Sequence, residues 1–534
     1  MSQPASQSRS HPSVVSRVPS FLIAGTYLAA AILAWLHLTQ GPRVQRVDIR
    51  WAPAVSAADR ARAEQEMGLV NGAWVEGRTW QYLLRKRSPE DIQRLISDPR
   101  VEDTDRLDRT TLRVRLDRPD LPPRVRGWLE SDRLGSISLA LTVVALVLTW
   151  RLRASAVAMV AAVRGPFGLT LAVWPFVAES AWEYYREVSA GGDNWRTADW
   201  LIWYMHGPVR RGLAGTFLLG VSNLGLSWKW VVYVAQVAIY AATVLLVVRL
   251  YAMRRREAAW LMLLYSPVFL LFPHFAPESA FRKEILAFLP LALLAIGYAR
   301  QQITRERIVT VGALFVLAAF SHEIAAFMLP FFLGLVYLSW KETVISTRVA
   351  QRLAVFFVLV STAGIATALL RPIDQATMAE LCQSLRDRGF RESICDGALA
   401  WLDKDITYGF VEKSIIIPKY LMFHAAAIAV SLVPLWAVRW WGGARTIMIV
   451  GALLWMLPLY VVSIDWGRWV YVYVFSLFTI VFADTVRHSG PVRRVPFPLV
   501  LLYLISWSIP LCCGYVFGGG WSRQIFDYVI RRAG

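Results

Sequence analysis

Charged side chains gather in four short segments that separate long apolar runs of this chain. The first segment carries Asp193, Asp199 and the adjacent pair Arg210–Arg211; the others are Phe281–Glu284, Ser321–Glu323 and Ile464–Trp469. Guanidinium groups bind phosphate through paired hydrogen bonds, and imidazole titrates near neutral pH. Polar groups beside membrane-embedded segments are costly, so they are functional candidates by default. These residue types therefore indicate chemistry on an anionic group.

Two sets of residues follow from this interpretation. The expected phosphate ligands are the cations of the four segments, Arg210, Arg211, Arg282, Lys283 and Arg468. The expected catalytic groups are His322, Glu323, Asp465, Asp193 and Asp199, which the sequence alone does not rank. Structural roles stay open for each segment: an aromatic belt, an Arg–Glu pair at a helix start, a polar hairpin turn, or an Asp465–Arg468 pair three residues apart. Asp193 and Asp199 suit Mg²⁺ as oxygen ligands, but their spacing proves no metal site.

Composition places these segments in a membrane protein. The 534 residues are 56% hydrophobic and only 18% charged, with a mean hydropathy of +0.43. The long apolar runs exclude a soluble enzyme, a disordered chain and a small disulfide scaffold. The net charge of +19 is expected from basic cytoplasmic loops, so we predict no nucleic-acid partner.

The apolar runs predict an all-α polytopic fold of about 13 transmembrane helices plus a re-entrant segment. The expected spans are 21–39, 135–151, 165–182, 229–250, 258–273, 284–299, 308–320, 324–340, 353–370, 418–437, 446–463, 469–486 and 497–513. We predict that the Gly-rich stretch 212–227 is re-entrant or interfacial, because an additional crossing would place the later basic loops on the external side of the membrane. The predicted organisation is a tail at 1–20, an anchor at 21–39, a small α+β domain at 40–134 and a membrane domain at 135–534.

Arginine-rich turns between the spans predict the sidedness of the chain. Placing these turns in the cytoplasm also places the N-terminus there, and leaves 40–134, 183–228 and 371–417 outside. The four charged segments then share the external face. Cys382 and Cys395 fall in one external loop, where we expect a disulfide; two unpaired thiols are the alternative.

The external insert predicts a β-α-α-β-β order. Residues 46–51 alternate as a strand, Ser56 suits an N-cap, Ser88–Pro89 opens a second helix, and strands are expected near 100–105 and 111–116. In topology this insert resembles a POTRA-type periplasmic module. The resemblance implies docking of an envelope protein on 40–134, with a passive folded insert as the alternative.

From residue 165 to 513, the order of spans and polar turns resembles bacterial polytopic glycosyltransferases of the GT-C superfamily and EpsG/Wzy-type polysaccharide polymerases. Arg282 and His322 each precede an apolar helix, as the arginine and histidine of the polymerases do; Lys283 and Glu323 depart from that pattern. The resemblance implies the bacterial inner membrane, a polyprenyl-phosphate-linked sugar as donor and membrane lipid as partner. It requires no cofactor and allows a divalent cation.

Two other classes of protein compete with this reading. A transporter or flippase of lipid-linked or anionic solutes would use broken helices and internal repeats; the stretch 212–227 favours it, but no repeat is evident. A cell-envelope scaffold would use only the insert. The sequence contains no Walker A, HExxH or CxxC motif, so nucleotide-driven chemistry has no support, and the sequence does not decide whether a metal takes part.

Overall fold

The computed structural model describes part of the chain, in two separate units, Met1–Val163 and Arg164–Gly534. The described residues are 45–52, 54–66, 70–76, 79–84, 100–105, 166–204, 207, 209–253, 259–370, 375–402, 417–463, 465–488, 490–512 and 516–522. The predicted tail 1–20, the spans 21–39 and 135–151, the helix at 88–98 and the strand at 111–116 lie outside these residues.

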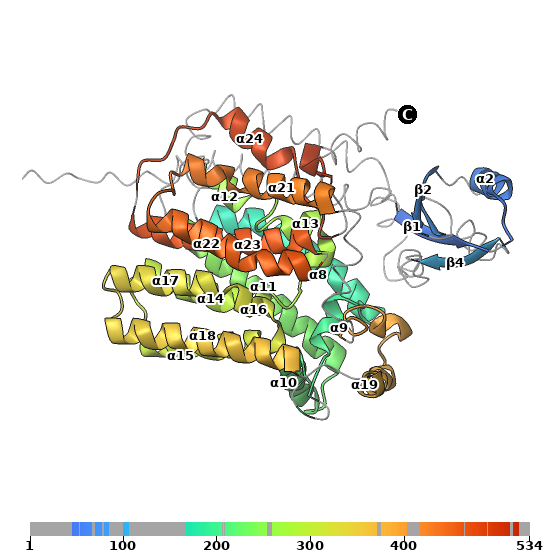
Figure 1. Ribbon diagram of the computed structural model, residues 1–534, viewed down its shortest axis with the longest axis horizontal. Helices are drawn as coiled ribbons and strands as arrows, with labels where there is room; N and C mark the ends of the chain where they lie inside the picture. Colours follow the sequence, from blue (N-terminus) through green and yellow to red (C-terminus); the bar gives the residue numbers. More distant parts are fainter. Residues whose placement is uncertain are drawn as a thin grey trace, which may run out of the picture. The chain divides into compact units, whose positions relative to one another are not determined.

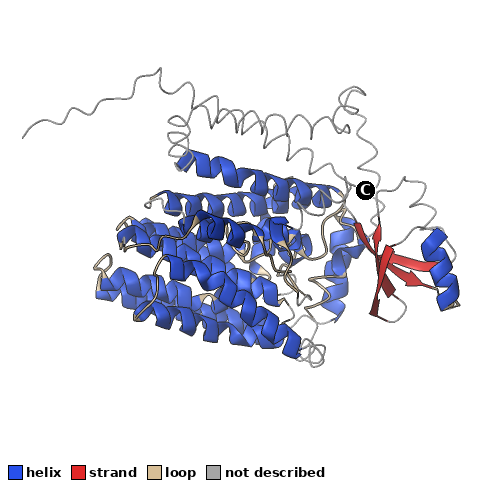
Figure 2. Ribbon diagram, turned by 90° about the horizontal axis from the view of Figure 1, so that it is seen from above, coloured by secondary structure: helices blue, strands red, loops and turns tan. Residues whose placement is uncertain are grey.

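The first unit contains a four-stranded antiparallel sheet in the order β2-β3-β1-β4, shown in red in Figure 2. Its elements are β1 (Gln45–Trp51), α2 (Ala57–Glu66), β2 (Val70–Glu76), β3 (Thr79–Leu84) and β4 (Val101–Asp105). Ser56 Oγ accepts the amide of Asp59 at 3.1 Å and caps α2 as predicted. The hairpin β2–β3 was not predicted, although its Trp, Tyr and Val residues favour strands.

The second unit is a bundle of helices (Figure 1). Its longer helices are α8 (Pro166–Ser189), α11 (Trp228–Ala252), α14 (Ile285–Ala299), α15 (Arg305–Ser321), α17 (Leu329–Lys341), α18 (Thr347–Leu370), α19 (Gln375–Asp387), α21 (Ile417–Ala437), α22 (Ala444–Val462) and α23 (Trp466–Arg487). Its shorter helices are α9 (Arg196–Trp200), α10 (Leu213–Ser222), α12 (Ala259–Leu264), α13 (Phe272–Phe275), η2 (Pro277–Ser279), α16 (Ile324–Phe327), η3 (Glu392–Cys395) and α24 (Phe497–Ile505).

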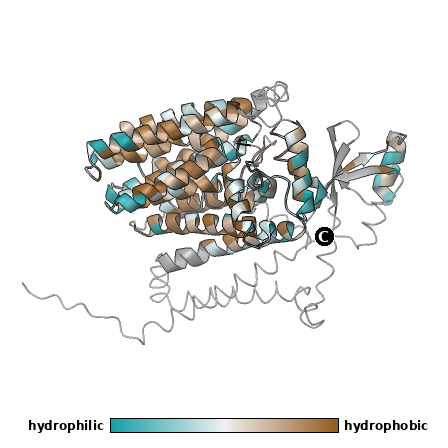
Figure 3. Ribbon diagram, turned by 90° about the horizontal axis from the view of Figure 1, so that it is seen from below, coloured by the Kyte–Doolittle hydropathy of each residue, from teal (hydrophilic) through white to brown (hydrophobic). Residues whose placement is uncertain are grey.

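Five of the described helices are long and apolar enough to cross a membrane: α11, α18, α21, α22 and α23. Along the bundle, the helices are hydrophobic through most of their length and hydrophilic near their ends (Figure 3). The helices α14 and α23 form the centre, because nearly all their residues are buried and they pack on each other. Only 22% of the apolar stretch of α18 and 28% of that of α22 is buried inside the bundle, as is typical of lipid-facing helices.

Three predicted spans are interrupted in the structure. The stretch 258–273 splits into α12 and α13, the stretch 324–340 into α16 and α17, and α24 covers only the first part of 497–513. Pro267 and Pro273 lack amide donors, which accounts for the first interruption. The doubtful stretch 212–227 forms the ten-residue helix α10, about 15 Å long and too short to cross a bilayer alone.

Candidate functional site

The first charged segment forms a buried turn that leads into α9. Asp193 Oδ1 accepts the backbone amides of Trp195 at 2.9 Å and Arg196 at 2.5 Å, which caps this short helix. Trp200 Nε1 donates to the carbonyl oxygen of Phe281 at 2.9 Å. The second charged segment is thereby bonded to α9, so residues about 80 positions apart in the chain become neighbours.

Lys283 is fully buried in the resulting contact. Its Nζ donates to the carbonyl oxygen of Arg211 at 2.8 Å and lies 3.7 Å from Asp199 Oδ1. Burial lowers the pKa of Lys283 to about 8, although Asp199 opposes part of that shift. Burial alone would raise the pKa of Asp199, but the charges of Lys283 and Arg211 outweigh it and lower that pKa to about 2.

Glu323 joins the twin arginines. Its Oε2 accepts from Arg211 Nε at 2.8 Å, and its Oε1 accepts from Arg210 Nε. Arg211 also lies 3.6 Å from Asp199, and its φ of 65° is left-handed, a conformation that costs a side-chain-bearing residue about 1 kcal/mol. Burial raises the pKa of Glu323, but Arg211 and Arg210 outweigh it and hold the pKa well below its usual value.

His322 ends α15 and faces two donors. Its Nδ1 accepts the amide of Ile324 at 3.1 Å, and its Nε2 lies 3.2 Å from a guanidinium nitrogen of Arg468. Burial and the charge of Arg211 lower the pKa of His322 to about 3, so the ring is neutral near pH 7. A neutral imidazole has one acceptor nitrogen, so it satisfies only one of these donors at a time.

Arg468 connects the fourth charged segment to the others. It lies in the first turn of α23, donates to Glu284 and approaches Asp465 Oδ2 at 3.1 Å. The adjacent Gly467 permits this placement: a Cβ there would lie 1.8 Å from the carbonyl oxygen of Pro510. Arg468 is therefore held by one carboxylate of its own segment and one from the head of α14.

Arg282 lies at the edge of this group. Its Nε donates to the carbonyl oxygen of Glu278 at 2.9 Å, and its guanidinium lies over the ring of Trp195 at 5.5 Å. It is close enough to Arg468 for the two charges to repel. Arg282 therefore adds positive potential without a described carboxylate contact of its own.

The structure thus brings together nine of the ten predicted phosphate-binding and catalytic residues. We call the following set the cation cluster: Arg210, Arg211, Arg282, Lys283, Arg468, Asp199, Glu323, Asp465 and His322, with Glu284 added. Asp193 is placed apart, because it caps α9 and lies 4.0 Å from Arg391. Asp193 and Asp199 therefore face different partners rather than a shared point.

Two groups were missed by the sequence reasoning. Glu284 was read only as a local partner of Arg282 or Lys283, whereas it pairs with Arg468, 184 positions away. The second is a histidine–carboxylate pair, His274 Nδ1 with Glu179 Oε2 at 2.9 Å, beside the ring of Trp521. An isolated polar residue in an apolar run is the signal that marks His274.

The segment 371–417, predicted as an external loop, contacts the turn before α9 through its described residues 375–402. Cys382 and Cys395 form a disulfide with Cα atoms 6.0 Å apart. The Ala398 amide donates to the carbonyl oxygen of Asn194 at 2.8 Å, and the Arg391 amide to that of Gly191 at 3.1 Å. The bridged loop therefore supports the turn that precedes Asp199.

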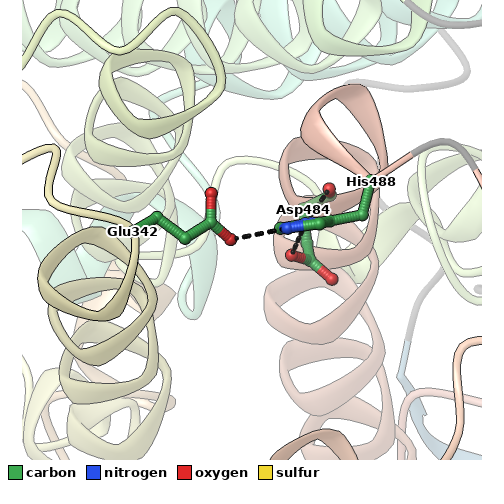
Figure 4. A group of neighbouring side chains, drawn as sticks. All are labelled: Glu342, Asp484 and His488. Atoms are coloured by element: carbon green, nitrogen blue, oxygen red, sulfur yellow. Dashed lines mark hydrogen bonds and ion pairs between the residues drawn. The ribbon is translucent and has the colours of Figure 1, made fainter.

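A second charge network, of which only Asp484 is fully buried, joins the ends of α17 and α23 and contains Glu342, Asp484 and His488 (Figure 4). His488 lies between the two carboxylates, with Nε2 3.0 Å from Glu342 Oε1 and Nδ1 3.0 Å from Asp484 Oδ1. The carboxylates also accept from Tyr298, Trp440 and Arg445, at 2.7–3.0 Å, and from Arg487. With these donors in place, the geometry is that of an ion-pair network between helices; we name it the α17–α23 network.

Comparison with known proteins finds no family model, no curated protein and no solved structure that matches this chain.

Proposed function

We propose that this chain is a membrane glycosyltransferase or polysaccharide polymerase that uses a polyprenyl-phosphate-linked sugar at the extracytoplasmic face. The observation that carries the proposal is the cation cluster: five cations from three chain segments lie among four carboxylates. The charges of Arg211 and Lys283 repel, as do those of Arg282 and Arg468. An additional anion relieves that repulsion, and guanidinium forks favour phosphate.

The proposed topology follows the sidedness argument. The chain crosses a bacterial inner membrane about 13 times, with a cytoplasmic N-terminus and the cation cluster outside. The sheet-containing unit acts as an extracytoplasmic POTRA-like docking domain for an envelope protein. A divalent cation is allowed at the phosphate, but the proposed transfer does not need one.

The proposed chemistry begins with a competition for the twin arginines. The substrate phosphate binds Arg210, Arg211 and Lys283 and displaces Glu323 from them. Once these charges engage phosphate, burial dominates and raises the pKa of Glu323. Glu323 then takes the proton of the acceptor hydroxyl, whose oxygen attacks the anomeric carbon. The bond from that carbon to the phosphate oxygen breaks, and the arginines stabilise the charge on the leaving polyprenyl phosphate or diphosphate.

A transporter or flippase is the second candidate, because α10 is a short helix packed between α11 and α15, and discontinuous helices are typical of transporters. A scaffold is the third. Purified protein reconstituted in vesicles with a radiolabelled undecaprenyl-diphosphate sugar separates the three. Release of the lipid carrier supports the enzyme, redistribution of intact donor between leaflets supports the transporter, and neither result leaves the scaffold.

Variants tie the assay to the cation cluster. Lys283→Ala and Arg210→Ala should abolish carrier release while the protein still inserts and elutes as a single species. The matched control is Arg386→Ala, which removes an arginine whose side chain and whose partner Glu392 are exposed in the bridged loop. If all three variants released the carrier at the rate of the native protein, the assignment of Lys283 and Arg210 as phosphate ligands would be overturned.

A further inference from the structure

A groove of about 340 Å³ lies where α17, α18 and α22 meet. Its walls include Leu329 and Leu333 from α17, Val358, Ser361 and Ile365 from α18, and Trp455 from α22. The helices α18 and α22 are candidate membrane spans of which only a minority of residues is buried inside the bundle. The groove therefore faces hydrocarbon, and its volume falls in the range of pockets that hold small ligands.

The groove is joined to the cation cluster through α16. This short helix begins directly after Glu323, and Trp455 Nε1 donates to the carbonyl oxygen of Ala326 at 3.1 Å. Leu329 follows Glu323 by six positions and is the first residue of α17. Trp455, in one wall of the groove, is thus hydrogen-bonded to α16, the helix that begins directly after Glu323.

The lining residues of α18 show which end of the groove lies nearer to the cation cluster. Gly364 packs against the end of α15, since a Cβ there would lie 2.7 Å from the carbonyl oxygen of Ala319. Ile365 is therefore level with the end of α15, which carries His322. Val358 lies two helical turns away, about 10 Å along the axis. The groove accordingly starts at the level of the cation cluster and runs away from it along α18.

We infer that this groove seats the hydrocarbon chain of the lipid whose phosphate binds the cation cluster. The inference rests on the proposed function and deepens it, because it names the part of the substrate that the bundle holds. Such a chain differs from passing membrane lipid in one respect. Its head group is bound in the cation cluster, so the chain enters the groove at the end near Ile365.

The first test is photocrosslinking with an undecaprenyl phosphate that carries a benzophenone on its chain. Label should appear on peptides of α17, α18 and α22, and excess unlabelled undecaprenyl phosphate should remove it whereas undecaprenol should not. Val358→Trp and Ile365→Trp should lose most of the label. The matched control is Leu359→Trp, at a residue 63% exposed on the same helix and outside the groove. Uniform labelling that undecaprenol also removes would identify passing lipid and overturn the inference.

The second test compares chain lengths in the transfer assay. Val358→Trp should raise KM about tenfold for an undecaprenyl-linked donor and leave a geranyl-linked donor unchanged. Equal effects on both donors would overturn the groove while leaving the proposed function standing. Specific crosslinking without transfer by any variant or by the native protein would instead remove the proposed function and keep the groove.

Discussion

Two charge networks at different helix ends use the same residue types to different effect. In the α17–α23 network, the carboxylates of Glu342 and Asp484 are surrounded by donors at hydrogen-bond distance. In the cation cluster, Asp199 lies 3.6–3.7 Å from its cations, and cations outnumber carboxylates. A saturated network joins helices, whereas an unsaturated cationic one has capacity left for an anion.

The largest expected effect is on carrier release, when an arginine of the cation cluster is replaced by lysine. Arg211→Lys keeps the charge but removes the fork that contacts Glu323, so carrier release should fall about 1,000-fold. The measurement is kcat/KM with the undecaprenyl-linked donor, beside the thermal unfolding of the solubilised protein. A fall of less than threefold would mean that Arg211 does not contact the reacting phosphate.

The next effect tests whether Glu323 is a base or only a partner of the arginines. Glu323→Gln removes the proton acceptor and also the carboxylate that competes with phosphate. We expect kcat to fall about 100-fold, while phosphate-bearing lipid binds as tightly as before or more tightly. Weaker binding together with unchanged kcat would assign Glu323 a purely structural role.

A smaller effect follows from the pKa of Lys283, about 8. Below that pH the ammonium is charged and attracts phosphate; above it the amine is neutral, so binding should weaken about tenfold as pH rises through 8. Lys283→Arg remains charged throughout and should flatten the profile. A profile identical in the native protein and Lys283→Arg would exclude Lys283 as the titrating group.

The smallest effect on transfer is expected from the α17–α23 network. Asp484→Asn removes the carboxylate that holds Arg445 at 2.8 Å and should cost about 3 kcal/mol of stability. Transfer at permissive temperature should stay within about threefold of the native rate. Loss of transfer comparable to that of Arg211→Lys, in a protein of unchanged stability, would erase the distinction between the networks.

Sequence patterns predicted where the apolar helices lie but not where they break. Hydropathy over a window of residues locates α11, α18 and α22, because each presents a long apolar run. The breaks at α12 and α16 depend on local backbone geometry and tertiary contacts, which a hydropathy average does not contain. The hairpin β2–β3 was missed for a similar reason, since it is short and adjoins a predicted helix.

The candidate site was predicted in composition but not in pairing. The residues of four separate segments were selected by type and by proximity to apolar runs. Partners such as Arg468 with Glu284, or Glu323 with both arginines, join positions more than 100 residues apart. Spacing along the chain carries no information about such pairs, so the different partners of Asp193 and Asp199 could not be predicted from the sequence.

The central claim is that the cation cluster binds the phosphate of a lipid-linked substrate. Its most direct test is equilibrium binding of undecaprenyl phosphate and of undecaprenol to the native protein in nanodiscs at pH 7. The account predicts that the phosphate-bearing lipid binds at least about tenfold more tightly, and that Arg211→Lys removes the difference. Equal affinity for the two lipids in the native protein would contradict it.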